Sequence, residues 1–189
     1  MKLKIVLACI IITTVIVGAM WVKPVKAEEI QIVGEPIPIE EMEKEEPAYT
    51  LCDVPMDADL QLWLFDYCED KHISPYMIMA MCERESQYKT DAVGDNGRSF
   101  GIMQIQEQWH TERMAELGCT DLLDARQNIT VAIDYLLELT EKNEDIGWVL
   151  MAYNGGMAYA YKQDKLSEYA EYILTRTEEL EQMDERNGR

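Results

Sequence analysis

Basic residues are scarce in this 189-residue chain. It contains 17 Lys and Arg against 36 Asp and Glu, a formal net charge of −19. Residues 1–27 hold four of the Lys and no acid, so residues 28–189 carry 13 bases against 36 acids, a net charge of −23. Because binding to phosphate backbones requires clustered Lys and Arg, nucleic acid is not an expected partner. A polyanionic substrate would have to be held by hydrogen bonds and stacking, or be brought close by anchoring.

Cysteine and histidine, the usual zinc ligands, are also few. Beyond Cys9, which lies in the apolar N-terminal segment, the chain has four cysteines: Cys52, Cys68, Cys82 and Cys119. They lack the close spacing of zinc ligands, and His72 and His110 are isolated, so we expect neither a metal nor a cofactor. Four cysteines allow three disulfide pairings, and buried thiols are the alternative. A bridge at Cys82 would stiffen its helix, but the sequence favours no partner for it.

The first 27 residues have the pattern of an export leader. Lys2 and Lys4 precede an uncharged run at residues 5–22, and the segment closes on Ala27, a small residue suited to signal-peptidase cleavage. The run is also just long enough to span a bilayer, so an uncleaved membrane anchor is the alternative. Both interpretations predict an exported protein, either secreted or held at the cell envelope.

Residues 28–50 contain eight Glu, one Lys and three Pro with little apolar periodicity, which predicts an extended acidic linker. We expect it to be solvated and to tether the domain away from a membrane. The domain itself is predicted at residues 51–175. Residues 176–189 are highly charged and are expected to form a solvated tail, with a partner-binding helix as the alternative.

Apolar periodicity and capping residues predict a mainly α domain. Ser74 followed by Pro75 is typical of a helix start, Asp124 caps a second strong helix, and Gly118 is typical of a helix end. Helices are expected at residues 57–68, 75–86, 104–117, 125–137, 145–153 and 165–183. Residues 87–100, rich in Gly, Asp, Asn and Ser, predict a loop, and no β pattern is expected.

Two glutamates lie in the last turn of the helix predicted at residues 75–86. Ile78, Met81 and Cys82 define its apolar stripe, and Glu85 continues that stripe at i+7. Glu83 lies about 200° around the helix from Glu85 at roughly 100° per residue, which predicts a solvated surface charge.

Burial of the Glu85 carboxyl would raise its pKa, and a carboxyl that stays protonated near neutral pH is what a general acid needs. The alternative is a structural role, in which Glu85 lies just outside the core and pairs with Arg84 or Arg98. Spacing alone does not decide between the two.

Four short motifs follow one another along the chain. They are Glu85-Ser86, Gly101-Ile102-Met103-Gln104, Asn128-Ile129 and Ala152-Tyr153-Asn154-Gly155-Gly156. In order and distance they resemble the E-S, G-L-M-Q, N-I and A-Y-N-x-G motifs of the SLT-type lytic transglycosylases of the lysozyme-like superfamily. The resemblance spans residues 57–174. It implies a lysozyme-like α-helical domain whose active-site cleft surrounds the end of the helix that carries Glu85.

By this resemblance, Glu85 is the acid and base of a bacterial lyase. The family cleaves the β-1,4 bond between N-acetylmuramic acid and N-acetylglucosamine in peptidoglycan strands and leaves a 1,6-anhydromuramoyl end. This chemistry consumes no water, and the N-acetyl carbonyl of the substrate can shelter the oxocarbenium-like state, so no second carboxylate is needed. The small size and acidic linker suggest local wall opening or remodelling, for example for a secretion or conjugation apparatus, by analogy only.

The resemblance also implies residues that bind substrate. Gln104 matches a Gln that hydrogen-bonds the sugar, and Met103 would form an apolar wall beside it, with core packing as the alternative. Ser86 would orient substrate or bond its own helix end. Tyr153 and Asn154 match the turn that brings a Tyr hydroxyl near the catalytic carboxyl.

Residues 169–174 resemble a Y-V-x-x-V-L motif of the same family. The match makes Tyr169 a candidate neighbour of Glu85, and Tyr172 is the alternative.

One loop is similar to that of goose-type lysozymes, relatives that hydrolyse the same bond with an extra aspartate. Residues 93–97 carry this likeness, and Asp95 is the candidate aspartate. Gln106 stands where those lysozymes have another Asp and cannot act as a base, which favours the non-hydrolytic route. A third hypothesis is a glycan-binding module in which Glu85 is only structural.

Overall fold

Helices dominate the part of the chain that the structure describes. The structure is a computed structural model describing residues 50–186, so the predicted leader and all but the last residue of the 28–50 linker lie outside the described residues. Within that range it has seven helices and one two-stranded sheet, which confirms the predicted mainly α class. None of the helices in residues 50–186 combines the length and the apolar content that crossing a membrane requires.

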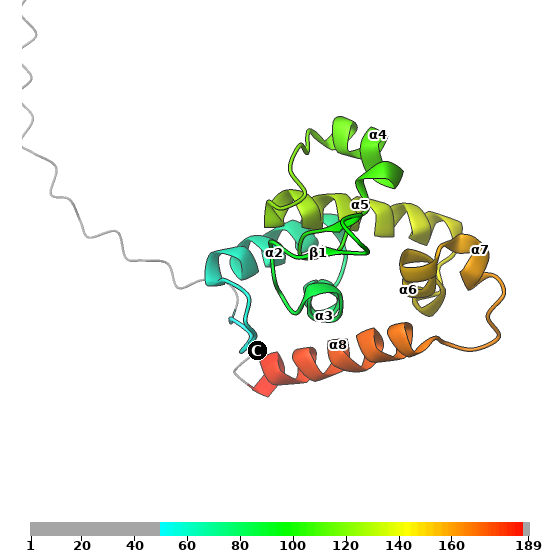
Figure 1. Ribbon diagram of the computed structural model, residues 1–189. Helices are drawn as coiled ribbons and strands as arrows, with labels where there is room; N and C mark the ends of the chain where they lie inside the picture. The colour runs from blue at the N-terminus through cyan, green and yellow to red at the C-terminus, as the bar shows by residue number, and fades with distance from the viewer. Residues whose placement is uncertain (1–49, 187–189) are drawn as a thin grey trace, which may run out of the picture. The chain divides into compact units, whose positions relative to one another are not determined.

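The helices follow the chain in a simple order (Figure 1). They are α2 (Ala58–Lys71), α3 (Pro75–Ser86), α4 (Glu107–Leu117), α5 (Ala125–Lys142), α6 (Ile146–Gly155), α7 (Met157–Ala160) and α8 (Glu168–Arg186). The starts of α3, α5 and α6 are capped by side chains, two of them, Ser74 and Asp124, as the sequence predicts. Ser74 accepts a hydrogen bond from the Met77 amide, Asp124 from the Gln127 amide and Asp145 from the Trp148 amide.

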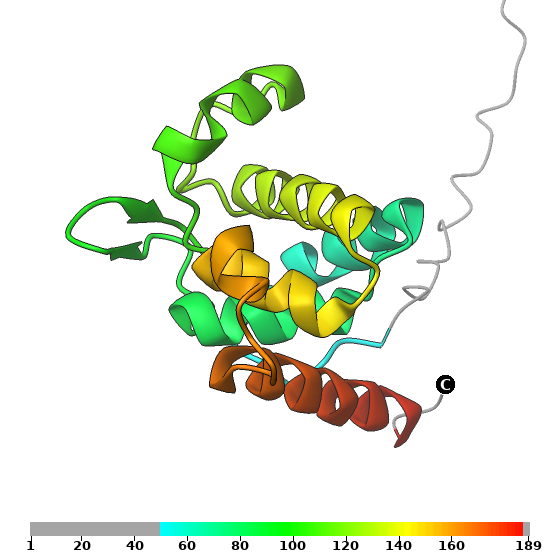
Figure 2. The ribbon, with the colours of Figure 1, turned by 90° about the vertical axis from the view of Figure 1, so that its right-hand side faces the viewer.

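Helix α3 lies between α5 and α8, an arrangement visible in two perpendicular views (Figures 1 and 2). Every residue from Met77 to Cys82 is buried, so α3 is apolar on all sides rather than along one stripe. A helix that is apolar all round is stable only when neighbours enclose it, and here α5 and α8 contribute buried Ile133, Leu136 and Ile173. The last turn of α3 emerges from this core and carries both glutamates.

A short β-hairpin projects beyond α3 (Figure 2). Strand β1 (Val93–Gly94) pairs antiparallel with β2 (Ser99–Phe100), and Val93 lies opposite Phe100. The prediction of a plain loop at residues 87–100 was therefore wrong. Two residues per strand are too few to show an alternating pattern in the sequence.

Two helix boundaries also differ from the prediction. Helix α4 begins at Glu107 rather than at Gln104, because Gln104 has a left-handed backbone with φ of 50°. Helix α8 extends to Arg186, and Leu180 is fully buried. Residues 176–186 thus differ from the solvated tail that was expected.

The cysteines of the described range are buried. Cys68, Cys82 and Cys119 carry free thiols, and Cys52 is buried beside α2. Burial raises the pKa of the Cys68 thiol to about 12, so this thiol stays protonated at neutral pH. The Cys82 thiol lies 3.3 Å from the sulfur of Met103, inside the core behind the end of α3.

Candidate active site

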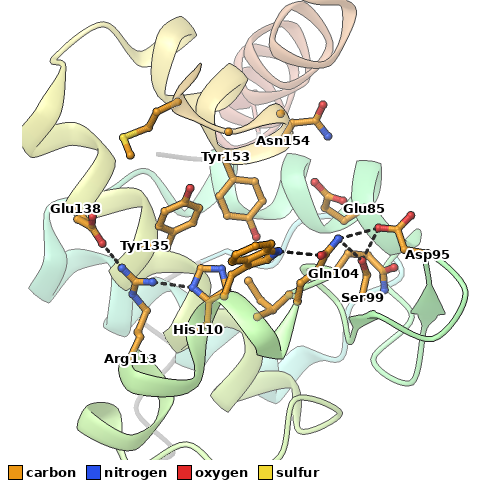
Figure 3. A pocket seen from close by; sticks show the side chains of 16 residues that line it. Glu85, Asp95, Ser99, Gln104, His110, Arg113, Tyr135, Glu138, Tyr153 and Asn154 are labelled. Atoms are coloured by element: carbon orange, nitrogen blue, oxygen red, sulfur yellow. Dashed lines mark hydrogen bonds and ion pairs between the residues drawn. The ribbon is translucent and has the colours of Figure 1, made fainter. Parts of the chain in front are cut away.

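A cleft of about 660 Å³ opens at the last turn of α3 (Figure 3). Its walls come from seven parts of the chain: the end of α3, the β-hairpin, the turn before α4, α4 itself, α5, the end of α6 and the start of α7. The lining residues are Glu85, Asp95, Ser99, Gln104, Ile105, Gln106, Trp109, His110, Arg113, Tyr135, Glu138, Tyr153, Asn154, Gly155, Gly156 and Met157. Four of the residues expected in the site, Glu85, Gln104, Tyr153 and Asn154, are among them.

Glu85 is half-buried at the edge of this cleft. Its Oε1 accepts a hydrogen bond of 2.6 Å from the hydroxyl of Tyr169 on α8. Burial raises the pKa of the carboxyl and the negative charge of Asp95 adds to this, while the Tyr169 bond and the Arg84 charge oppose it, and the net shift is upward. The carboxyl is therefore biased toward the protonated form that can donate a proton.

Glu83 is not the solvated charge that was expected. Its carboxylate accepts hydrogen bonds from the Tyr88 hydroxyl at 3.0 Å, the Tyr172 hydroxyl at 3.0 Å and Nε of Arg176 at 2.8 Å. Burial alone would raise its pKa, but these bonds outweigh burial and lower it. Glu83 therefore stays ionised and joins the end of α3 to α8.

The two tyrosines near the C-terminus have separate partners. Tyr169 bonds Glu85, whereas Tyr172, the alternative candidate, bonds Glu83. Positions 169, 172 and 176 share one face of α8, so this single face contacts both glutamates of α3.

Gln104 lines the cleft from the turn that precedes α4. Its Nε2 donates to the backbone oxygens of Gly101 at 2.9 Å and Ala92 at 3.3 Å. A side chain at Gly94 would collide with Gln104 Oε1, so the glycine leaves room for this amide. The NH₂ group is thus used within the protein, and the Oε1 atom lies against Gly94.

Tyr153 and Asn154 lie at the C-terminal end of α6. The Tyr153 hydroxyl donates to the backbone oxygen of Met103 at 2.9 Å, which ties α6 to the turn before α4. Burial is the main cause of the raised pKa of Tyr153, and the negative charge of Glu85 is the second cause. The Tyr153 hydroxyl therefore lies within electrostatic range of the Glu85 carboxyl. Asn154 is exposed on the cleft wall beside Gly155 and Gly156.

Ser86 and Met103 lie outside the cleft lining. The Ser86 hydroxyl is buried within hydrogen-bonding distance of the Cys82 and Ile102 backbone oxygens, at 3.1 and 2.9 Å. Met103 is fully buried, with its sulfur against Cys82. The geometry matches the alternatives given above, helix-end bonding for Ser86 and core packing for Met103.

Asn128 holds the turn that carries Gln104. This fully buried amide donates to the backbone oxygens of Phe100 at 2.8 Å and Leu122 at 2.9 Å, and accepts from the Met103 amide at 2.8 Å. A side chain at Gly101, where φ is 74°, would collide with Asn128 and with the Leu122 backbone. The second and third motifs of the sequence therefore meet in one buried hydrogen-bonded unit.

Asp95 lines the cleft from the tip of the hairpin. Its Oδ2 accepts hydrogen bonds from the Ser99 hydroxyl at 2.6 Å and from Gln106 Nε2 at 3.0 Å. Its backbone is left-handed, with φ of 48°, in a turn that ends at Gly97. Asp95 is thus hydrogen-bonded to Gln106, the residue that stands where goose-type lysozymes have another Asp.

A charged cluster at the other side of the cleft was not expected from the sequence. In Figure 3, Arg113 lies between Glu138 and His110 and bonds both, and it also pairs with Asp134. Burial and the Arg113 charge lower the pKa of His110 to about 4, against the opposing charges of Glu138 and Asp134, so the ring is neutral at pH 7. Arg113 also lies over the Tyr135 ring, 5.0 Å from its centroid. The cluster joins α4, which carries Arg113, to α5, which carries Asp134 and Glu138. The sequence of either helix alone does not indicate these ion pairs.

Comparison with known proteins supports a family assignment. The profile of the family described as Transglycosylase SLT domain matches residues 64–173, more than half of the chain. No curated protein matches the chain. Among solved structures, an inactive mutant of the lytic transglycosylase Slt from Pseudomonas aeruginosa is similar, with a TM-score of 0.57 and 18% identity over 68% of this chain. The match covers 24% of that protein, so the likeness concerns the fold of one part of it.

Proposed function

The chain belongs to the Transglycosylase SLT domain family, and from this we propose that it is a peptidoglycan lytic transglycosylase in which Glu85 acts first as acid and then as base. Its substrate is the β-1,4 bond between N-acetylmuramic acid and N-acetylglucosamine. Its product is a strand with a 1,6-anhydromuramoyl end. The observation that carries the proposal is a half-buried carboxyl of raised pKa that lines a cleft of about 660 Å³.

The proposed reaction needs one carboxyl group. Protonated Glu85 gives its proton to the glycosidic oxygen, which leaves with the electron pair of the bond to C1 of the muramoyl ring. The resulting Glu85 carboxylate then takes the proton of the C6 hydroxyl while that oxygen bonds C1. Glu85 is left protonated, as it began, and no water is used.

The neighbours of Glu85 suit this cycle. Tyr169 donates to the carboxylate form and so limits the rise in pKa that burial causes, which keeps both protonation states accessible. We assign sugar binding to Gln104 and Asn154, two polar residues of the cleft lining, and Tyr153 ties α6 to the turn before α4.

Hydrolysis is the second candidate, and Asp95 is the reason for it. Asp95 lines the same cleft, and its charge contributes to raising the pKa of Glu85. Against this role, Oδ2 of Asp95 already accepts hydrogen bonds from Ser99 and Gln106, so this oxygen is engaged within the protein.

We also propose that the domain acts outside the cytoplasm, secreted or anchored at the cell envelope. This rests on the basic, apolar and small-residue pattern of residues 1–27 alone.

Mass spectrometry of the products released from purified peptidoglycan tests these proposals. The full chain should release fragments with 1,6-anhydromuramoyl ends, Glu85→Gln should release none, and Glu144→Gln, which changes an exposed acid outside the cleft, should match the wild type. Reducing ends that disappear in Asp95→Asn would instead establish hydrolysis. Binding to peptidoglycan without release of fragments would leave a glycan-binding module.

A further inference from the structure

Trp109 stands out among the residues that line the cleft. It is 74% exposed, the largest value among the big apolar side chains of residues 50–186. It lies in the first turn of α4, and it borders both the cleft of Glu85 and an adjoining hollow of about 620 Å³. Glu85 lines only the first of these, so Trp109 lies where the cleft continues away from the catalytic carboxyl.

The indole ring is held in place despite its exposure. Its Nε1 donates to Gln106 Oε1 at 3.2 Å, and Gln106 Nε2 donates to Asp95 Oδ2 at 3.0 Å. The ring is thereby connected through one side chain to the hairpin that carries Asp95. A rigid, preorganised aromatic surface loses little freedom on binding, which favours its use in recognition.

The charges around Trp109 indicate what this surface can bind. Arg113, the basic residue shared by the two hollows, is already bonded to Asp134, Glu138 and His110. The adjoining hollow also presents Glu112, Glu116 and Glu141. A carboxylate would be repelled here, whereas a neutral ligand with an apolar face and polar edges would not be.

A pyranose ring has that chemistry. One face presents C–H groups that can pack on the indole, and the hydroxyl and N-acetyl groups at its edge can reach polar side chains such as Gln106 and Glu138. Of the two sugars in the strand, N-acetylglucosamine lacks the lactyl group that carries a carboxylate or a peptide, so it suits the acidic surroundings better.

We propose that Trp109 is a stacking platform for an N-acetylglucosamine unit of the glycan strand, at a subsite removed from the bond that is cut. The inference rests on the proposed function for the identity of the strand. Trp109 holds the substrate in the cleft of a strongly acidic protein, in which the described lining residues include no free cation.

Binding measured in the non-cleaving background tests the platform. Full-chain Glu85→Gln is titrated by calorimetry with N-acetylglucosamine oligomers and with peptide-free glycan strands. Adding Trp109→Ala should weaken both affinities about tenfold or more, as expected for removal of an aromatic anchor, and Trp109→Phe should weaken them by only about threefold. Tyr161→Ala removes another exposed aromatic, outside the cleft, and should change neither affinity.

Tryptophan fluorescence gives a readout that loss of structure would not produce. Glycan binding should alter the emission of Glu85→Gln, and Trp109→Phe should abolish that change while calorimetry still detects binding. With Glu85 intact, Trp109→Ala should raise KM and leave kcat unchanged, because the contact is the same in ground and transition states.

The outcomes separate this inference from the proposed function. Equal affinities for Trp109→Ala and the parent, or an unaltered emission change in Trp109→Phe, would overturn the platform even if the chain cleaves peptidoglycan. Loss of glycan affinity in Trp109→Ala, together with an absence of cleavage by the wild type, would support the platform and overturn the proposed reaction.

Discussion

The hydroxyl of Tyr169 donates a 2.6 Å hydrogen bond to Oε1 of Glu85. The bond joins α8 to the end of α3, although the two residues are 84 positions apart in the chain. A bond to the charged form of an acid lowers its pKa, so Tyr169 opposes the upward shift that burial causes. The protonation state of Glu85 is therefore set jointly by its burial at the end of α3 and by α8, which supplies the donor.

Tyr169→Phe should shift the pH profile of cleavage. Without the donor the pKa of Glu85 rises further, and since the acid form starts the reaction, the alkaline limb of kcat/KM should move to higher pH. We expect kcat to fall roughly tenfold because the carboxyl also loses its orientation. Tyr172→Phe removes a hydroxyl that bonds Glu83 instead, and should leave the alkaline limb in place. A downward movement in Tyr169→Phe would contradict the assignment.

Glu85→Gln should stabilise the fold at high pH. The native pKa of Glu85 is raised above its unfolded value of about 4.3, so its contribution to stability is complete below that pH and is lost as pH rises through the native pKa. The gain in unfolding free energy on substitution should therefore grow with pH, to about 1 kcal/mol, as is common when a functional site is neutralised. Urea denaturation at acidic and alkaline pH measures it, with Glu144→Gln as the control. A variant less stable than the wild type at alkaline pH would refute this.

Glu83→Gln should have the opposite effect. It weakens the bond to Arg176 and those from Tyr88 and Tyr172, and we expect a loss of about 1–2 kcal/mol at neutral pH. Because the native pKa of Glu83 is lowered, its contribution is present above the unfolded pKa and is lost as pH falls through the native value. The difference between variant and wild type should thus shrink in acid.

A double-mutant cycle with Arg176→Ala checks that the loss comes from this contact. The two substitutions should be less destabilising together than their separate effects predict. Simple additivity would show that the bond between α3 and α8 contributes nothing.

Local sequence patterns predict much of the fold because caps and periodicity act within a few residues. Ser74-Pro75 and Asp124 mark starts of α3 and α5 that the structure confirms. The same reasoning places Glu85 on the buried side of its helix, since i+7 returns to the same face.

Contacts between distant segments are what the sequence could not show. Glu83 was expected to face solvent, but α8 packs over it and supplies Arg176 and Tyr172. The link from His110 through Arg113 to Glu138 likewise depends on α4 packing beside α5. Periodicity reports which face of a helix is polar and does not report which polar residues of another helix it will meet.

The buried amide of Asn128 gives a prediction about the turn that presents Gln104. Asn128→Asp keeps the shape but places a carboxylate oxygen against the backbone oxygens of Phe100 and Leu122, to which the amide now donates. We expect a loss of about 3 kcal/mol or more at neutral pH, because the buried carboxylate keeps one donor, the Met103 amide, while its other oxygen faces two backbone oxygens. The native pKa of the new carboxyl should be raised, so the loss should be smaller in acid, where the protonated group can donate to one of the two oxygens.

Asn143→Asp is the matched control for this substitution. The Asn143 side chain only accepts, from the Asp145 amide at 2.9 Å, and an aspartate can do the same, so its stability should remain near that of the wild type. Thermal unfolding of both variants across pH makes the comparison. In Asn128→Asp, glycan affinity should fall together with stability, since the Met103 amide and the Gln104 turn depend on the same residue. Equal stability of the two variants at neutral pH would show that Asn128 does not hold the turn, and the positioning of Gln104 would then have to come from its own bonds to Gly101 and Ala92.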